Sequence, residues 1–347
     1  MPRHGENRRA VFILTPMNNL QVVLASRPEG PVTEKNFRFV ESAIPTPDEG
    51  EVLVRNLYLS LDPYMRMRMN DGKSYAPPVQ LGEVMVGGTV GEVVESRDPR
   101  FKQGDIVGSR SGWQLYASAD ASTLRKVDTR GAPLSTALGV VGMPGVTAWY
   151  GLLRIGEPKP GETVVVSAAS GAVGSVVGQI ARLKGCRTVG IAGGPVKCDY
   201  VVKELGFDAC VDYKSDGFES KLREAAPDGI DIYFENVGGA VLDAVLPLLN
   251  AFARIPFCGY VSEYDDSGSY GVQHLRSLLV SRVRLQGFII SEHLELWDEA
   301  LTDLSGWFNA GKLNYHETIA HGLESAPAAF IGMLKGLNLG KQLVKLA

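Results

Sequence analysis

Cysteine and histidine are scarce in this chain of 347 residues, with four of the first and five of the second. The cysteines all lie in the second half and show no CxxC spacing: Cys186, Cys198, Cys210 and Cys258. We therefore expect buried, reduced thiols and neither disulfides nor zinc ligands. Residues 1–185 contain one histidine, His4, and the later histidines form no HExxH-like pair. Because zinc sites are built from clustered Cys and His ligands, the sequence predicts no metal site.

Basic runs and long apolar runs are also missing. The formal net charge is −4 and no Lys- or Arg-rich segment occurs, so no surface for nucleic acid is expected. No apolar run approaches the length of a membrane span, and the VFIL segment at Val11–Leu14 is soon broken by Pro16. We expect no membrane partner and a cytoplasmic location. With 45% hydrophobic residues, the chain is long enough to form two domains.

The most informative segment present runs from Val164 to Gly194. Three valines predict a strand, Ala169, Gly171 and Gly174 match GxGxxG with alanine at the first position, and a helix is expected from about Val173 to Lys184. Small residues in this turn let backbone N–H groups approach a pyrophosphate at the helix N-terminus. A packing turn in some other α/β protein is the alternative, and the flanking strand and helix make it weaker.

The end of the next expected strand, Arg187–Ala192, indicates which dinucleotide binds. An NAD site places an acidic residue about 20 residues after the glycines, where it bonds the ribose 2′-hydroxyl. This chain has no acid there, and Lys197 follows at the expected start of the next helix. The pattern favours NADPH or NADP, with Lys197 near the 2′-phosphate. A solvated surface lysine is the alternative for this residue.

Strand and turn patterns predict a two-domain architecture. Short β-branched runs from Gln21 to Val127 are typical of a small antiparallel β domain. The pattern becomes helical over Leu138–Leu153, and strands then alternate with helices. The further strands are expected at Ala209–Tyr213, Ile230–Gly239, Ala253–Gly259 and Arg284–Ile290. With the first two they make the six strands of a doubly wound parallel sheet, so the fold class is α/β. From about Asn309 the chain is expected to return to the first domain.

Several runs together resemble the zinc-independent medium-chain dehydrogenase/reductases, in the prostaglandin and leukotriene reductase branch. The match extends over nearly the whole chain from Gln21 onward. The runs are LASRPEG, YLSLDPYMR, VMVGGTVGEVVE, GMPGVTAWYGL, SAASGAVGSVVGQIARLKGC, ENVGG, ARIPFCG, LQGFII and PAAFIGMLKGLNLGK. VLPLLNAFARIPFCG and SLDPYMRMRM are most similar to the bacterial curcumin reductases.

The resemblance implies a GroES-like catalytic domain, at residues 1–140 and closed by 310–347, and a Rossmann domain at 141–309 with strand order 3-2-1-4-5-6. It also implies NADPH-dependent reduction of the carbon–carbon double bond of an α,β-unsaturated ketone or aldehyde. Relatives of this kind are commonly dimers, so a homodimer is expected.

The resemblance also assigns cofactor contacts. Those to the phosphates fall on Gly171, Ala172, Val173, Gly174, Lys197 and Tyr213. Those nearer the nicotinamide, with one from the C-terminal segment, fall on Asn236, Cys258, Gly259, Tyr264, Phe288, Ile289, Ile290 and Asn338. The ENVGG turn that holds Asn236 also has a purely structural explanation, as an ordinary loop after a strand.

Without a metal, another group must polarise the substrate carbonyl, and tyrosine is suited to this. With a pKa near 10 it stays a neutral O–H donor at neutral pH. By resemblance, Tyr264 lies beside the nicotinamide ribose and the substrate carbonyl, and Tyr64 and Tyr75 line the substrate site. An amphipathic core residue is the alternative for each, and the chain contains 12 tyrosines.

Two segments depart from the family pattern. The loop DDSGSYGVQHL after Tyr264 is shorter than in relatives and lacks their prolines, which leaves substrate size open. The segment Ala10–Asn19 is an addition that would form either an edge strand or a disordered tail. Two alternatives for function stay open at this stage, an NADPH-dependent quinone reductase and a non-catalytic NADPH-binding sensor.

Overall fold

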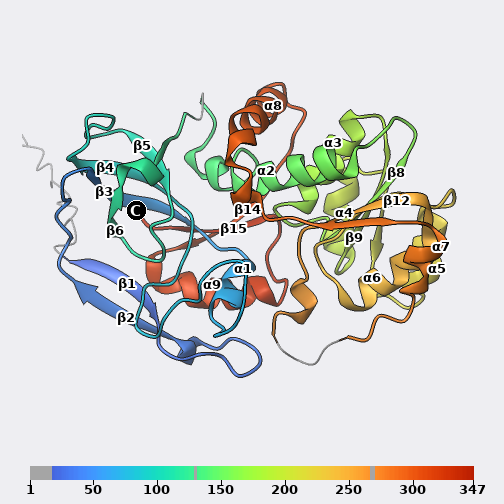
Figure 1. Ribbon diagram of the computed structural model, residues 1–347, viewed down its shortest axis with the longest axis horizontal. Helices are drawn as coiled ribbons and strands as arrows, with labels where there is room; N and C mark the ends of the chain where they lie inside the picture. The colour runs from blue at the N-terminus through green and yellow to red at the C-terminus, as the bar shows by residue number, and fades with distance from the viewer. Residues whose placement is uncertain (1–17, 129–130, 266–269) are drawn as a thin grey trace, which may run out of the picture.

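The structure, a computed structural model, describes residues 18–128, 131–265 and 270–347. In these ranges the strands form three sheets, of two, six and seven strands. Figure 1 shows the two larger sheets in separate lobes, with the C-terminal strand β15 in the lobe of the N-terminal strands. Most of the added segment Ala10–Asn19 lies outside the described residues, and the first strand begins at its last residue.

The six-stranded sheet is parallel throughout, in the order β10-β9-β8-β11-β12-β13. Numbered along the chain within the sheet, this is the predicted order 3-2-1-4-5-6. The strands are β8 (Thr163–Ser167), β9 (Arg187–Ala192), β10 (Ala209–Asp212), β11 (Ile230–Phe234), β12 (Leu249–Phe257) and β13 (Arg284–Gly287). The expected strands are confirmed, with corrected bounds: β11 ends at Phe234 and not at Gly239, β12 starts four residues before Ala253, and β13 ends before Phe288.

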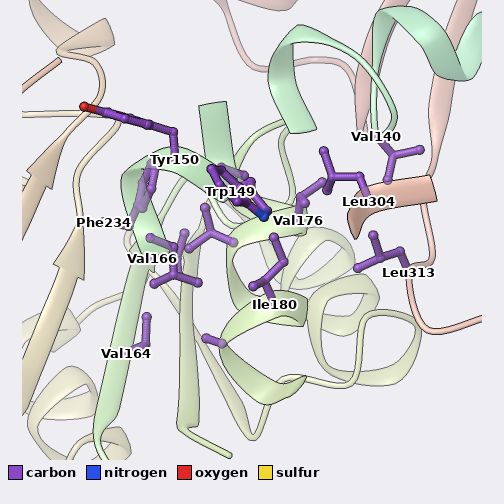
Figure 2. Packing of buried hydrophobic residues seen from close by; sticks show 14 of the residues in the cluster. Val140, Trp149, Tyr150, Val164, Val166, Val176, Ile180, Phe234, Leu304 and Leu313 are labelled. Carbon is purple, nitrogen blue, oxygen red and sulfur yellow. The ribbon is translucent and has the colours of Figure 1, made fainter. Parts of the chain in front are cut away.

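Both faces of the central strand β8 are buried, which explains its run of three valines. Val164 and Val166 of β8 pack in one apolar cluster with Trp149 and Ile180, as Figure 2 shows, while Val165 packs in a second cluster. The helices of this lobe are α2 (Met143–Tyr150), α3 (Gly174–Leu183), α4 (Pro195–Lys203), α5 (Phe218–Ala225), α6 (Gly239–Val245), α7 (Arg276–Val280) and α8 (Trp297–Asn309).

The β-rich lobe contains the seven-stranded sheet and the β1–β2 hairpin sheet. Its strands are β1 (Asn19–Leu24), β2 (Phe37–Ser42), β3 (Glu51–Ser60), β4 (Thr89–Ser96), β5 (Ile106–Ser109), β6 (Tyr116–Asp120), β7 (Arg125–Lys126), β14 (Glu317–His321) and β15 (Lys341–Lys345). Its helices are α1 (Tyr64–Arg68) and α9 (Ala326–Leu334). Strand β15 pairs antiparallel with β3, so the C-terminal segment joins this sheet. All strand pairs within Gln21–Val127 are antiparallel, as expected, and the sheet becomes mixed only because β14 of the returning segment runs parallel to β15.

All four cysteines are free, as expected. Cys186 is buried, but Cys198, Cys210 and Cys258 are half-buried, so the prediction of four buried thiols holds for one of them. Across the described ranges, no helix is long and apolar enough to cross a membrane.

Candidate functional site

The glycine turn joins the end of β8 to the start of α3. A Cβ added to Gly174 would lie 2.4 Å from the carbonyl oxygen of Ala168, so a side chain here would force the backbone to move. Gly171, Ala172 and Val173 form the half-buried turn between them. The turn thus presents backbone N–H groups at the positive end of a ten-residue helix, an arrangement that attracts a phosphate.

A segment from the β-rich lobe lies against this turn. The N–H of Gly340 donates to the carbonyl oxygen of Ser170 at 3.0 Å, and Gly340 forms a parallel bridge with Gly171. Asn338 is held in the same segment, because its Nδ2 donates to the Gly340 carbonyl oxygen at 2.9 Å. The structure therefore brings Asn338 close to the glycine turn, although the two are far apart in the sequence.

Lys197 lies in the first turn of α4, immediately beyond the end of β9. Its Nζ donates to the Gly336 carbonyl oxygen at 2.7 Å, and burial and the nearby Lys214 lower its pKa. The Nζ of Lys214 is 5.8 Å from the centre of the Tyr213 ring. Lys197, Tyr213 and Lys214 therefore gather at one end of the sheet, where two cations would face a phosphate. Sequence reasoning missed Lys214, although its position next to Tyr213 was a usable signal.

A carboxylate at this end of the sheet belongs to Asp212, the last residue of β10. Its Oδ1 accepts the N–H groups of Gly194 at 2.8 Å and Lys214 at 2.9 Å. The hydrogen bond from Gly194, and that from Lys214, lower the pKa of Asp212. These bonds hold the loop after β9 beside the loop after β10, so this acid has a structural task in the loops.

Glu235, at the end of β11, ties together two loops of the expected nicotinamide site. Its carbonyl oxygen accepts the N–H groups of Cys258 at 2.9 Å and Gly259 at 3.1 Å, and its Oε1 accepts that of Val237 at 2.5 Å. Asn236 is fixed as well, because its Nδ2 donates to the Ser167 carbonyl oxygen at 2.8 Å. Burial raises the pKa of Glu235. Sequence reasoning missed this residue, since no local pattern indicates that one carboxylate joins these loops.

Three expected contacts follow strand β13. The ring of Phe288 lies 5.4 Å from that of Tyr150 and 6.4 Å from that of Phe234, measured between centroids. Ile289 is half-buried, and Ile290 packs in the apolar core of the lobe. A contact from Ile290 to a ligand would therefore use its backbone.

The three candidate tyrosines converge from the two lobes. Tyr64 begins α1 and Tyr75 follows it in the β-rich lobe, whereas Tyr264 follows the loop after β12. Burial is the main cause of the raised pKa of each tyrosine. Tyr75 adds to the raised pKa values of Tyr64 and Tyr264, and Cys258 adds to those of Tyr75 and Tyr264, so Tyr75 lies near both of the other tyrosines. Tyr75 is 52% exposed, whereas the other two tyrosines are half-buried.

The Tyr264 hydroxyl is arranged to act as a donor. Its oxygen accepts the backbone N–H of Tyr260 at 3.4 Å, a bond that uses a lone pair of the hydroxyl and not its proton. Burial, as the main cause, raises the pKa of Tyr264, and burial likewise raises that of Tyr64. Both side chains therefore stay neutral, with a proton to donate, throughout the neutral pH range.

Possible metal ligands do not cluster in the part of the chain that the structure describes. Within residues 18–128, 131–265 and 270–347, no three His, Cys, Asp or Glu side chains are grouped so that they could hold a metal ion. His4 lies outside these ranges.

Comparison with known proteins places these observations in a family. Residues 20–127 match the model described as the N-terminal domain of oxidoreductase, and residues 172–306 match that of the zinc-binding dehydrogenases. The chain is 52% identical over 335 residues to the NADPH-dependent curcumin reductase of Escherichia coli, covering 95% of this chain and 97% of that protein. It is 46% identical to the prostaglandin reductase 1 of Rattus norvegicus, covering 91% and 96%. The 2-alkenal reductase of Nicotiana tabacum is 42% identical, with 94% and 97% covered.

A solved structure shares the whole architecture. CurA from Vibrio vulnificus, crystallised in complex with NADPH, superposes with a TM-score of 0.91 at 50% identity and covers 94% of this chain and 99% of its own. The fold is thus a Rossmann domain combined with a GroES-like domain. The chain belongs to the medium-chain dehydrogenase/reductase family, in the branch that contains the curcumin, prostaglandin and 2-alkenal reductases.

Proposed function

We propose that this protein uses NADPH to reduce the carbon–carbon double bond of α,β-unsaturated ketones and aldehydes. The observation that carries the proposal is the 3.1 Å bond between Arg66 and Asp265, which brings the segments of Tyr64 and Tyr264 together from the two lobes. Tyr75 lies near both tyrosines. Relatives that cover nearly the whole chain are named as reductases of curcumin, prostaglandins and 2-alkenals, which supports the same substrate class.

The residues present fit NADPH. The turn before α3 leaves no room for a Cβ at Gly174 beside the Ala168 carbonyl oxygen, which is the close packing that the third glycine of the dinucleotide-binding fingerprint allows. Lys197 and Lys214, with the Tyr213 hydroxyl, would hold the 2′-phosphate. Asn236 and the Cys258–Gly259 backbone would hold the nicotinamide end, and Asn338 would reach the cofactor from the β-rich lobe.

NADPH, when bound, supplies the hydride that adds to the β-carbon of the substrate, and a proton from solvent or from a tyrosine completes the reduction at the α-carbon. The role of Tyr264 in this reaction is to donate a hydrogen bond to the carbonyl oxygen as negative charge develops there. A hydroxyl of the nicotinamide ribose is the other candidate donor. Tyr64 and Tyr75 would line the substrate site and orient the enone. Holding the β-carbon of the substrate against the nicotinamide lowers the barrier by roughly several kcal/mol.

Turnover of matched substrates tests this proposal. Purified protein is given NADPH with a panel of enones, enals and quinones, and NADPH oxidation is followed together with product identification. We expect saturated ketones and aldehydes as products, with quinones turned over more slowly. Faster turnover of quinones would instead favour a quinone reductase, and NADPH binding without turnover of any of these would favour a sensor.

We also propose that catalysis needs no zinc, since the chain has no cysteine and only His4 before residue 186 to serve as soft ligands. A cytoplasmic location is supported by the four free thiols, which are typical of a reducing compartment. For the two domains we propose the boundaries given by the sequence, 1–140 with 310–347 and 141–309.

For the assembly we propose a homodimer formed at strand β13. This strand ends the six-stranded sheet, and all four of its residues are exposed. Leu279 and Val280 of the preceding helix and Leu285 of the strand are exposed beside this edge. Pairing with the same edge of a second copy would satisfy the backbone groups of the strand and bury these side chains.

A further inference from the structure

We propose that the ion pair between Arg66 and Asp265 is a positioning device that sets Tyr64 and Tyr264 relative to each other. The Nε of Arg66 donates to Oδ1 of Asp265 at 3.1 Å. Arg66 lies in α1, two residues after Tyr64, and Asp265 directly follows Tyr264. The pair joins residues 199 positions apart and connects the β-rich lobe to the loop that follows β12. The inference rests on the catalytic role proposed above for the two tyrosines.

The guanidinium of Arg66 is held rigidly on its own side. Its side chain is 1% exposed, Nη1 donates to Oδ1 of Asn70 at 2.6 Å, and Nη2 donates to the Gly30 carbonyl oxygen at 3.0 Å. Because these two bonds fix the plane of the group, the direction of its Nε–H is fixed as well. A buried guanidinium also requires an opposite charge, and Asp265 supplies one from the other lobe.

The ion pair between Arg66 and Asp265 acts at the substrate end of the site. With α1 only five residues long, fixing Arg66 also fixes the rotation of the helix and the direction in which Tyr64 leaves it. At the cofactor end, other contacts join the lobes: Lys197 donates to the Gly336 carbonyl oxygen, and Gly340 donates to that of Ser170. Loss of the ion pair should therefore displace the tyrosines and leave NADPH binding nearly unchanged.

Asp265→Ala tests this with Glu92→Ala as the matched control. Glu92 pairs with Arg55 at 2.7 Å, and its side chain is 35% exposed, against 34% for Asp265. Unlike Arg66 and Asp265, however, Glu92 and Arg55 lie in the same sheet. We expect Asp265→Ala to lower kcat/KM for an enone about tenfold, because small misplacements of reacting groups are costly. The Kd for NADPH should change less than about twofold. Glu92→Ala should change neither, and Asp265→Asn, which keeps an acceptor, should recover part of the loss.

Two further measurements separate this inference from the proposed function. In a Tyr264→Phe background, Asp265→Ala should lower kcat/KM by a smaller factor than in the wild type, since the two residues act as a unit. Amide hydrogen exchange, which needs no turnover, should become faster in both 61–68 and 258–265 in Asp265→Ala and in neither in Glu92→Ala. An unchanged kcat/KM with unchanged amide exchange in Asp265→Ala would overturn the positioning role. A loss of NADPH affinity as large as the loss of kcat/KM would overturn it too. A Tyr264→Phe enzyme of normal activity would instead refute the proposed catalytic role.

Discussion

At the scale of single residues, environment decides what each tyrosine and lysine of the site can do. Burial raises the pKa of Tyr64, Tyr264 and Tyr75, although Tyr75 is the most exposed of the three at 52%. A raised tyrosine pKa favours the neutral form in the folded protein. The resulting stabilisation is present below pH 10 and is lost only as the pH rises through the raised value. These hydroxyls therefore remain donors across the whole neutral range.

Tyr264→Phe removes the donor proposed for the developing oxyanion and leaves the ring in place. We expect kcat for an enone to fall by roughly ten- to a thousand-fold. The Kd for NADPH should change little, because the glycine turn and Lys197 are untouched. Steady-state kinetics and a parallel NADPH titration measure the two effects. Normal enone turnover in this variant would assign the role to the ribose hydroxyl or to another tyrosine.

Lys197→Ala should weaken NADPH binding by about ten- to a hundred-fold, since a charge-assisted bond to phosphate contributes about 1.5–3 kcal/mol. The lower end of this range is expected, because Lys214 and Tyr213 remain at the same end of the sheet. NADH has no 2′-phosphate, so its binding should barely change. Lys203→Ala, in the same helix and paired only with surface Asp199 among the described ion pairs, is the control. Equal losses for NADPH and NADH would show that Lys197 supports the fold.

At the scale of elements, the proposed cofactor end is formed by the turn between β8 and α3. The segment before β15 returns to this turn and completes it. The turn is specified locally by Ala169, Gly171 and Gly174. Its partner, the segment before β15, reaches it through the bond from Gly340 to Ser170. A substitution in this turn should therefore weaken NADPH binding more than the same substitution in a remote helix.

Gly174→Ala tests the turn. The new Cβ would lie 2.4 Å from the Ala168 carbonyl oxygen, a backbone atom that must move. We expect NADPH affinity to fall at least about tenfold and stability to fall by about 1–3 kcal/mol. Gly306→Ala in α8 is the control, because nothing lies within 4 Å of its added Cβ. That helix should gain about 0.5–1 kcal/mol. Unchanged NADPH binding in Gly174→Ala would remove the turn from the site.

At the scale of the whole molecule, two lobes of different construction meet at one site. The Rossmann lobe has a parallel sheet whose central strand β8 is buried on both faces, while the other lobe is a mixed β structure that includes the C-terminal strands. Each lobe supplies candidate tyrosines, and both lobes contribute to the proposed cofactor end. Metal content and assembly are properties of the whole molecule.

Exhaustive chelation should leave enone reduction unchanged. The sequence before residue 186 offers no cysteine and one histidine, so a catalytic zinc would lack its usual ligands. Activity before and after dialysis against a chelator, together with elemental analysis, measures this. Stoichiometric zinc whose removal abolishes activity, and whose return restores it, would contradict the prediction.

We expect the protein to be a dimer in solution. Sedimentation or light scattering should then give twice the mass of the chain. Leu279→Lys, at a side chain 79% exposed beside β13, should weaken the dimer by placing a charge in the proposed interface. Leu337→Lys is the control, with a side chain 78% exposed in the β-rich lobe. A monomeric wild type, or equal weakening by both variants, would place the interface elsewhere.

The sequence by itself determined the features that depend on local pattern. Valine runs specified the buried strands, small residues specified the turn at Gly171–Gly174, and the missing acid after β9 indicated NADPH. The order of the six strands followed from the recognised family. The domain boundaries and the roles of the site residues stay predictions.

Tertiary structure decided what depends on residues distant in the chain. It brought Lys214 beside Lys197, made Glu235 the link between two loops, and paired Arg66 with Asp265. It also set β14 parallel to β15. The physical reason is that such contacts form only when separate elements pack. An arginine in a short helix and an aspartate 199 residues later carry no local sign of each other, because burial and the direction of each side chain exist only in the folded chain.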